Sequence, residues 1–77
     1  MWKYINNMMK GNFGKILKEL RREKEILQSG LGKVLNVANN TISSWERGNS
    51  EPSLEQLKIL AQYFDVTTDY LLGVTED

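Results

Sequence analysis

Apolar residues recur along the chain at the three- and four-residue spacing of amphipathic helices. The first segment with the i, i+3, i+4, i+7 spacing of one helix face consists of Phe13, Ile16, Leu17 and Leu20. It predicts a helix over about residues 13–24. Asn12 directly precedes this segment and is the predicted N-cap, because an Asn side chain can accept a hydrogen bond from a free N–H of the first turn.

A second helix is predicted over about residues 28–35, with an apolar stripe formed by Leu31, Val34 and Leu35. Gly30 and Gly32 each cost such a helix roughly 1 kcal/mol relative to Ala. We therefore expect another helix to cross closely here, where a side chain would stand in the way. Asn36 follows, and Asn tolerates the left-handed conformation that ends a helix and begins a sharp turn.

A third helix is predicted over about residues 39–47, ending at Gly48 and burying Ile42 and part of Trp45. We expect the Trp45 ring to pack in the core. Ala38 precedes this helix and offers no side-chain cap.

Two further helices complete an all-α prediction. Ser53-Leu54-Glu55-Gln56 is a capping box that opens the fourth helix, and Thr67 caps a short fifth helix that ends near Leu72, before Gly73. The apolar face of the fourth helix comprises Leu54, Leu57, Leu60, Ala61 and Phe64. The pattern thus predicts a compact bundle of five short helices over residues 12–77, with a helix-turn-helix over about 28–47. Residues 1–11 are expected to be a flexible N-terminal extension.

The polar residues of the segment 39–47 gather on one face of its predicted helix: Asn39, Asn40, Ser43, Ser44 and Arg47. An Asn amide offers a donor and an acceptor in one plane, which match N6 and N7 of adenine in the DNA major groove. Ser hydroxyls can pair with either kind of base edge, and Arg47 suits a phosphate. Gln28, at the start of the second helix, is also predicted to contact phosphate, assisted by the free N–H groups of the helix end.

Charge is distributed unevenly along the chain, although its formal net value is zero. Residues 1–35 carry eight Lys and Arg against three Glu, a net charge of +5, and residues 36–77 carry two against seven acids, a net charge of −5. One face can therefore still attract phosphate.

Composition argues against an enzyme. The chain has no Cys and no His, so it lacks a thiol nucleophile and the commonest general base and metal ligand. No phosphate-cradling glycine loop or metal-ligand spacing is present. We expect no catalytic residues, no cofactor and no metal. The apolar runs are too short to span a membrane, and the composition fits a cytoplasmic protein.

The run from Leu35 to Gly48, LNVANNTISSWERG, resembles the core motif of the Cro/Xre family of lambda-repressor-like helix-turn-helix DNA-binding proteins. Gln28, Glu51-Pro52-Ser53-Leu54 and Asp69-Tyr70-Leu71-Leu72-Gly73 add further matches, so that the resemblance covers about residues 13–73. It implies a lambda-repressor-like fold. It departs from the family's usual residues at Leu27, Gly32, Asn36 and Ala38.

The resemblance also implies residue roles. Asn39, Asn40 and Ser44 match positions that contact bases, and Ser43 lies between them. Gln28 and Arg47 match positions that contact phosphates. Arg21 and Glu46 match an ion pair that ties the first helix to the end of the third.

The sequence is compatible with two functions. The leading hypothesis is a sequence-specific regulator of transcription that binds double-stranded DNA, a repressor acting as a homodimer on a palindromic operator. Its dimer surface is expected near Tyr70, Leu71 and Val74. The alternative is a protein-interaction module with the same fold, such as an antitoxin that holds a toxin or a phage protein that binds another regulator.

Overall fold

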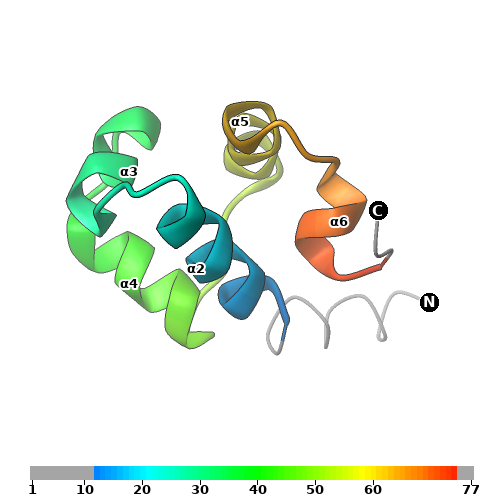
Figure 1. Cartoon of the computed structure of the whole chain (residues 1–77). Helices are drawn as coiled ribbons and strands as arrows, with labels where there is room; N and C mark the ends of the chain where they lie inside the picture. The colour runs from blue at the N-terminus through cyan, green and yellow to red at the C-terminus, as the bar shows by residue number, and fades with distance from the viewer. Residues whose placement is uncertain (1–11, 75–77) are drawn as a thin grey trace.

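The computed structural model describes residues 12–74 as a bundle of short helices (Figure 1). The helices are α2 (Gly14–Glu23), α3 (Gln28–Leu35), α4 (Asn39–Arg47), α5 (Leu54–Phe64) and α6 (Thr68–Leu72). No strand occurs within residues 12–74. The all-α prediction is confirmed, and the predicted helices lie where the sequence pattern placed them. The extension predicted over residues 1–11 lies outside the described residues.

Helices α2, α3 and α4 pack together, with α5 and α6 beside them (Figure 1). The most extensive pairing joins α3 to α4, and α2 also packs on α4. Helix α5 contacts both α3 and α6. Helix α4 is therefore fixed from behind by two other helices, which determines which of its faces is left open.

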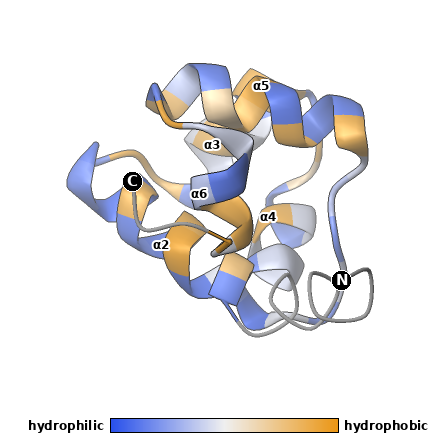
Figure 2. Ribbon diagram, turned by 90° about the vertical axis from the view of Figure 1, so that its right-hand side faces the viewer, coloured by the Kyte–Doolittle hydropathy of each residue, from blue (hydrophilic) through white to orange (hydrophobic). Residues whose placement is uncertain are grey.

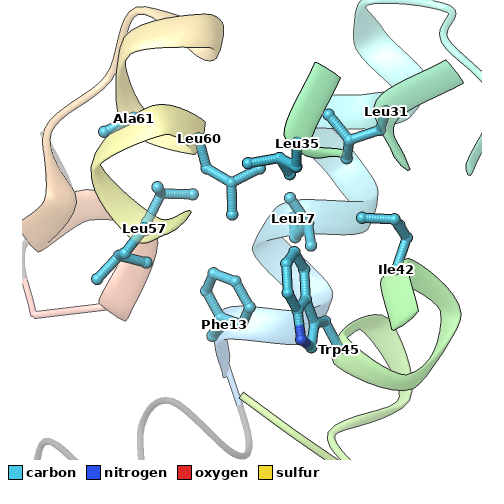
Figure 3. Packing of buried hydrophobic residues seen from close by; sticks show 10 residues of the cluster. Phe13, Leu17, Leu31, Leu35, Ile42, Trp45, Leu57, Leu60 and Ala61 are labelled. Atoms are coloured by element: carbon cyan, nitrogen blue, oxygen red, sulfur yellow. The ribbon is translucent and has the colours of Figure 1, made fainter. Parts of the chain in front are cut away.

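One hydrophobic core joins the five helices of residues 12–74, and Figure 3 shows side chains from α2, α3, α4 and α5 pointing toward a common centre. Each large apolar side chain that is fully buried contributes about 1.5–3 kcal/mol to folding. Figure 2 shows hydrophobic and hydrophilic segments alternating along α2 and α5, as expected for helices with one buried face. The buried residues are Phe13, Leu17, Leu31, Leu35, Ile42, Trp45, Leu57, Leu60, Ala61 and Leu71.

Three predictions about apolar positions are wrong. Val34 and Leu54 were assigned to core faces, yet they are 41% and 82% exposed. Around α3, Val34 lies about 60° from Leu31 and about 100° from Leu35, at the edge of the buried stripe. Leu54 is the first residue of α5, three positions before the buried Leu57. Leu71 is fully buried within the same chain, so it cannot form part of a dimer surface, whereas Tyr70 and Val74 remain accessible.

The predicted helix ends are confirmed with one exception. Asn12 does not cap α2: the N-cap position falls on Phe13, which has helical dihedral angles and no side-chain capping bond, because Asn12 and Phe13 are themselves in a π-helical turn. At α5 both bonds of the capping box between Ser53 and Gln56 are present. Thr67 accepts a hydrogen bond from the N–H of Tyr70 at the start of α6.

The expectation that another helix crosses closely at Gly32 is also wrong, because Gly32 makes room for a turn. A Cβ at Gly32 would lie 2.7 Å from the carbonyl oxygen of Val37, in the turn that follows α3. The N–H of Val37 donates to the carbonyl of Gly32 at 2.9 Å. A close helix crossing does occur, but between α2 and α4, at Gly14.

Candidate nucleic-acid interface

The turn between α3 and α4 is held by backbone hydrogen bonds. Asn36 adopts the left-handed conformation, with φ 59° and ψ 45°, and its N–H donates to the carbonyl of Lys33 at 3.3 Å. Ala38 is extended and has no capping side chain, as predicted, and the N–H of Thr41 donates to its carbonyl at 3.0 Å. The turn therefore fixes the direction in which α4 leaves α3.

Helix α4 has one buried face and one open face. Ile42 and Trp45 are buried in the core, as predicted. Asn39, Asn40 and Arg47 are exposed, while Ser43 and Ser44 are half-buried. The five polar residues singled out from the sequence thus lie on α4 away from the core. Their side chains offer hydrogen-bond donors and acceptors along nine residues of one helix.

Hydrogen bonds already hold part of this polar face. The Arg47 Nη1 donates to Ser43 Oγ at 2.7 Å, which lays the guanidinium back along the helix. The hydroxyls of Ser44 and Ser50 lie 2.7 Å apart, and either can be the donor. Ser50 belongs to the loop after α4, and no sequence pattern singles it out, because the turn at Gly48 and Asn49 intervenes.

A buried carboxylate connects α2, α3 and α4. Glu46 Oε2 accepts from Arg21 Nε at 2.6 Å, and its Oε1 accepts from Arg21 Nη2 at 3.2 Å. Arg21 Nη1 also donates to the carbonyl of Ile26 at 3.0 Å, in the loop before α3. The Gln28 side-chain amide donates to Glu46 Oε1 at 3.0 Å. The Arg21 and Glu46 side chains are only 13% and 4% exposed, so water screens this ion pair weakly.

The starts of α3 and α4 meet at an open depression, whose lining residues are Arg21, Leu27, Gln28, Ser29 and Asn39. The first N–H groups of α3 have no partner inside the helix, and its N-cap residue, Leu27, makes no side-chain capping bond. Free N–H groups and the helix dipole give such a helix start a partial positive charge. The depression is therefore suited to an anion.

The formal charges of the helix-turn-helix as a whole are also favourable for an anion. The helix-turn-helix, residues 28–47, carries Lys33, Glu46 and Arg47. Glu46 is paired with Arg21. The other two charged residues of this segment, Lys33 and Arg47, have no counter-charge within the described chain, and both are positive. This local balance differs from the neutral total of the chain.

Other kinds of site find no support within residues 12–74. No group of three or more potential metal ligands gathers there. None of the helices in this part of the chain has the length and apolar character needed to cross a membrane.

Residues 17–71 match the protein family described as helix-turn-helix. Among curated proteins, the HTH-type transcriptional regulator ImmR of Bacillus subtilis is 38% identical over 65 residues, which make up 84% of this chain and 51% of that protein. The HTH-type transcriptional activator BcrR of Enterococcus faecalis is 39% identical over 64 residues, 83% of this chain and 31% of that protein. The chain thus spans about half of the first relative and less of the second.

A solved structure is also similar along nearly its whole length. The crystal structure of the c2 repressor of Salmonella phage P22 in complex with a synthetic operator has a TM-score of 0.77 and 36% sequence identity. The similarity covers 82% of this chain and 96% of that one. Both the sequence and the arrangement of the helices are therefore shared.

Proposed function

The chain belongs to the helix-turn-helix family, of the Cro/Xre type, and from this membership we propose that it binds double-stranded DNA in a sequence-specific manner and regulates transcription. The observation that carries this proposal is the open polar face of α4. Residues that form helices poorly are concentrated on it, which helix stability alone would not favour. The operator complex of the similar P22 c2 repressor supports the same use of this fold.

In the proposed complex α4 lies in the major groove. Asn39 and Asn40 are exposed at its start, and recognition helices contact base edges with their N-terminal residues. An Asn amide pairs with adenine through N6 and N7, and the hydroxyls of Ser43 and Ser44 pair with neighbouring base edges.

Two other groups contact the DNA backbone in this proposal. Gln28 and the free N–H groups at the start of α3 bind one phosphate in the open depression. Arg47, at the far end of α4, binds another. These contacts orient the protein on the duplex but do not distinguish sequences.

We further propose that the protein acts as a homodimer and a repressor. A single module of this size buries roughly 600–1,000 Å² on DNA, whereas larger dimers bury more. Two copies related by a dyad bind half-sites about 34 Å apart, so the operator is a palindrome. Repression needs only occupancy of a promoter, whereas activation needs a further surface for polymerase.

The salt dependence of duplex binding tests the proposal. Binding to a random-sequence duplex is measured by fluorescence anisotropy at a series of salt concentrations for the wild type, Arg47→Ala and Lys58→Ala. Lys58 is an exposed control on α5, a helix outside the helix-turn-helix. Because each neutralised phosphate contributes about 0.9 to the slope of log K against log salt, Arg47→Ala lowers the slope by about 1 and Lys58→Ala leaves it unchanged.

The same titration separates DNA binding from the alternative function. If the protein shows no salt-dependent retention of duplex, the DNA-binding proposal is wrong. The open face of α4 then serves a protein partner, such as a toxin or another regulator.

A further inference from the structure

The carboxylate of Glu46 accepts one hydrogen bond in addition to those from its ion-pair partner, Arg21. Arg21 already contacts both carboxylate oxygens, through Nε at 2.6 Å and Nη2 at 3.2 Å. The third donor is the Gln28 side-chain amide, at 3.0 Å from Oε1. Glu46 lies near the end of α4 and Gln28 is the first residue of α3, so this bond links the end of α4 to the start of α3, and Gln28 also lines the open depression.

We propose that Glu46 is a positioning residue for DNA binding, which holds the Gln28 amide ready for a phosphate. The amide group has two N–H donors. One is bound to Glu46, and the other remains for an oxygen in the depression lined by Gln28, Ser29 and Asn39. This inference rests on the proposed function and adds a residue that itself contacts no DNA.

Preorganisation is the physical reason for such an arrangement. A free glutamine side chain samples many rotamers, and immobilising it on binding lowers affinity. Glu46 is nearly fully buried and is itself fixed by Arg21, so its oxygen is a rigid acceptor. The Arg21 guanidinium also neutralises the carboxylate, which therefore does not repel a nearby phosphate.

A double-mutant comparison tests the coupling between the two residues. Gln28→Ala is made in three backgrounds: the wild type, Glu46→Asp, which withdraws the carboxylate, and Glu55→Asp, the same change at an exposed glutamate of α5 outside the helix-turn-helix. Affinity for a random-sequence duplex is measured, because a phosphate contact is independent of sequence. We expect Gln28→Ala to lower affinity about tenfold in the wild-type and Glu55→Asp backgrounds. In Glu46→Asp the same change costs about twofold or less, because the amide there is no longer oriented.

The side-chain amide signals of the DNA-free protein provide a second readout. In a ¹⁵N-resolved NMR spectrum we expect the NH₂ protons of Gln28 to exchange with water more slowly than those of Gln62, an exposed glutamine of α5. In Glu46→Asp the two residues become alike. A merely structural role for Glu46 would leave the Gln28 amide unchanged. This measurement on the wild type remains decisive even if Glu46→Asp does not fold.

The outcomes separate this inference from the proposed function. Absence of duplex binding by the wild type overturns the function and the inference together. Duplex binding with an equal loss on Gln28→Ala in the wild-type and Glu46→Asp backgrounds overturns the positioning role alone. So does a Gln28 amide that exchanges as fast as that of Gln62.

Discussion

The backbone of α2 touches that of α4 at Gly14 and Trp45. A Cβ at Gly14 would lie 2.6 Å from the carbonyl oxygen of Trp45, and 2.6 Å from that of Glu46. Both atoms belong to the backbone of α4, which cannot move without moving the helix. This contact determines how closely α4, the helix with the polar open face, packs against the rest of the bundle.

Gly14→Ala is therefore expected to destabilise the protein. The added methyl forces α2 and α4 apart, and overpacking of this kind costs about 1–3 kcal/mol. Gly30→Ala is the matched control, because a Cβ there would meet only the flexible side chain of Ile26, at 2.9 Å. The better helix propensity of Ala, about 1 kcal/mol, offsets that strain. Urea unfolding followed by circular dichroism measures both, and equal stabilities of the two variants would contradict the account.

Glu25→Gly is expected to stabilise the protein by about 1 kcal/mol. Glu25 is exposed and has a φ of 58° in the turn between α2 and α3, and a side chain in the left-handed region costs roughly 1–2 kcal/mol. Glu19→Gly removes the same charge from the middle of α2, where glycine is expected to cost about 1 kcal/mol. Thermal unfolding of the two variants should shift in opposite directions. A loss of stability in Glu25→Gly would show that its conformation is not strained.

Within one helix, we expect the largest difference in the cost of truncation to alanine between two leucines of α5. Leu60 is fully buried and Leu54 is 82% exposed. Truncation of a buried leucine to alanine costs 2–5 kcal/mol, about the stability of a small domain. We expect Leu60→Ala to unfold at much lower urea concentration and Leu54→Ala to remain within about 0.5 kcal/mol of the wild type. A large loss in Leu54→Ala would reveal a contact that covers this side chain in solution.

Much of the fold could be predicted from local patterns. The helix ends at Asn36, Gly48, Ser53 and Thr67 follow from the preferences of single residues for caps and left-handed turns, and the structure confirms them. Spacing of apolar residues also located α2, α3, α4 and α5. These signals are encoded within a few residues, so no tertiary contact needs to be known.

Burial and long-range pairing could not be predicted in the same way. Apolar spacing shows which face of a helix is hydrophobic but not how far a neighbouring helix extends over it, which is why Leu54 and Val34 were misplaced. Likewise, a glycine in a helix indicates that another part of the chain approaches closely, but not which part. The close crossing of two helices that was expected at Gly32 occurs at Gly14.

In the candidate site, too, local features could be predicted from the sequence and long-range contacts could not. The polar face of α4 follows from helical periodicity, whereas the bond between Gln28 and Glu46 joins residues 18 positions apart. The bond from Ser44 to Ser50 crosses a turn. Neither leaves a periodic signal, because each depends on how the helices are packed.

Asn40→Ala tests the role of the exposed amide in reading bases. We expect it to cost about 1–3 kcal/mol on the specific DNA site and little on random DNA, because a base contact contributes only where the matching base is present. Gln62→Ala on α5 is the control, since it removes an exposed amide outside the helix-turn-helix. Titration of each variant with both duplexes measures the difference. Equal losses on the two duplexes would exclude a base-reading role for Asn40.

Selection from a pool of randomised duplex DNA, followed by sequencing, tests whether the protein binds DNA in a sequence-specific manner. We expect enrichment of a palindrome whose half-sites lie one helical turn apart, because two copies of α4 enter successive major grooves on one side of the duplex. The enriched sequence then supplies the specific site for the Asn40→Ala titration. A pool that remains random after repeated rounds would contradict sequence-specific DNA binding by this protein.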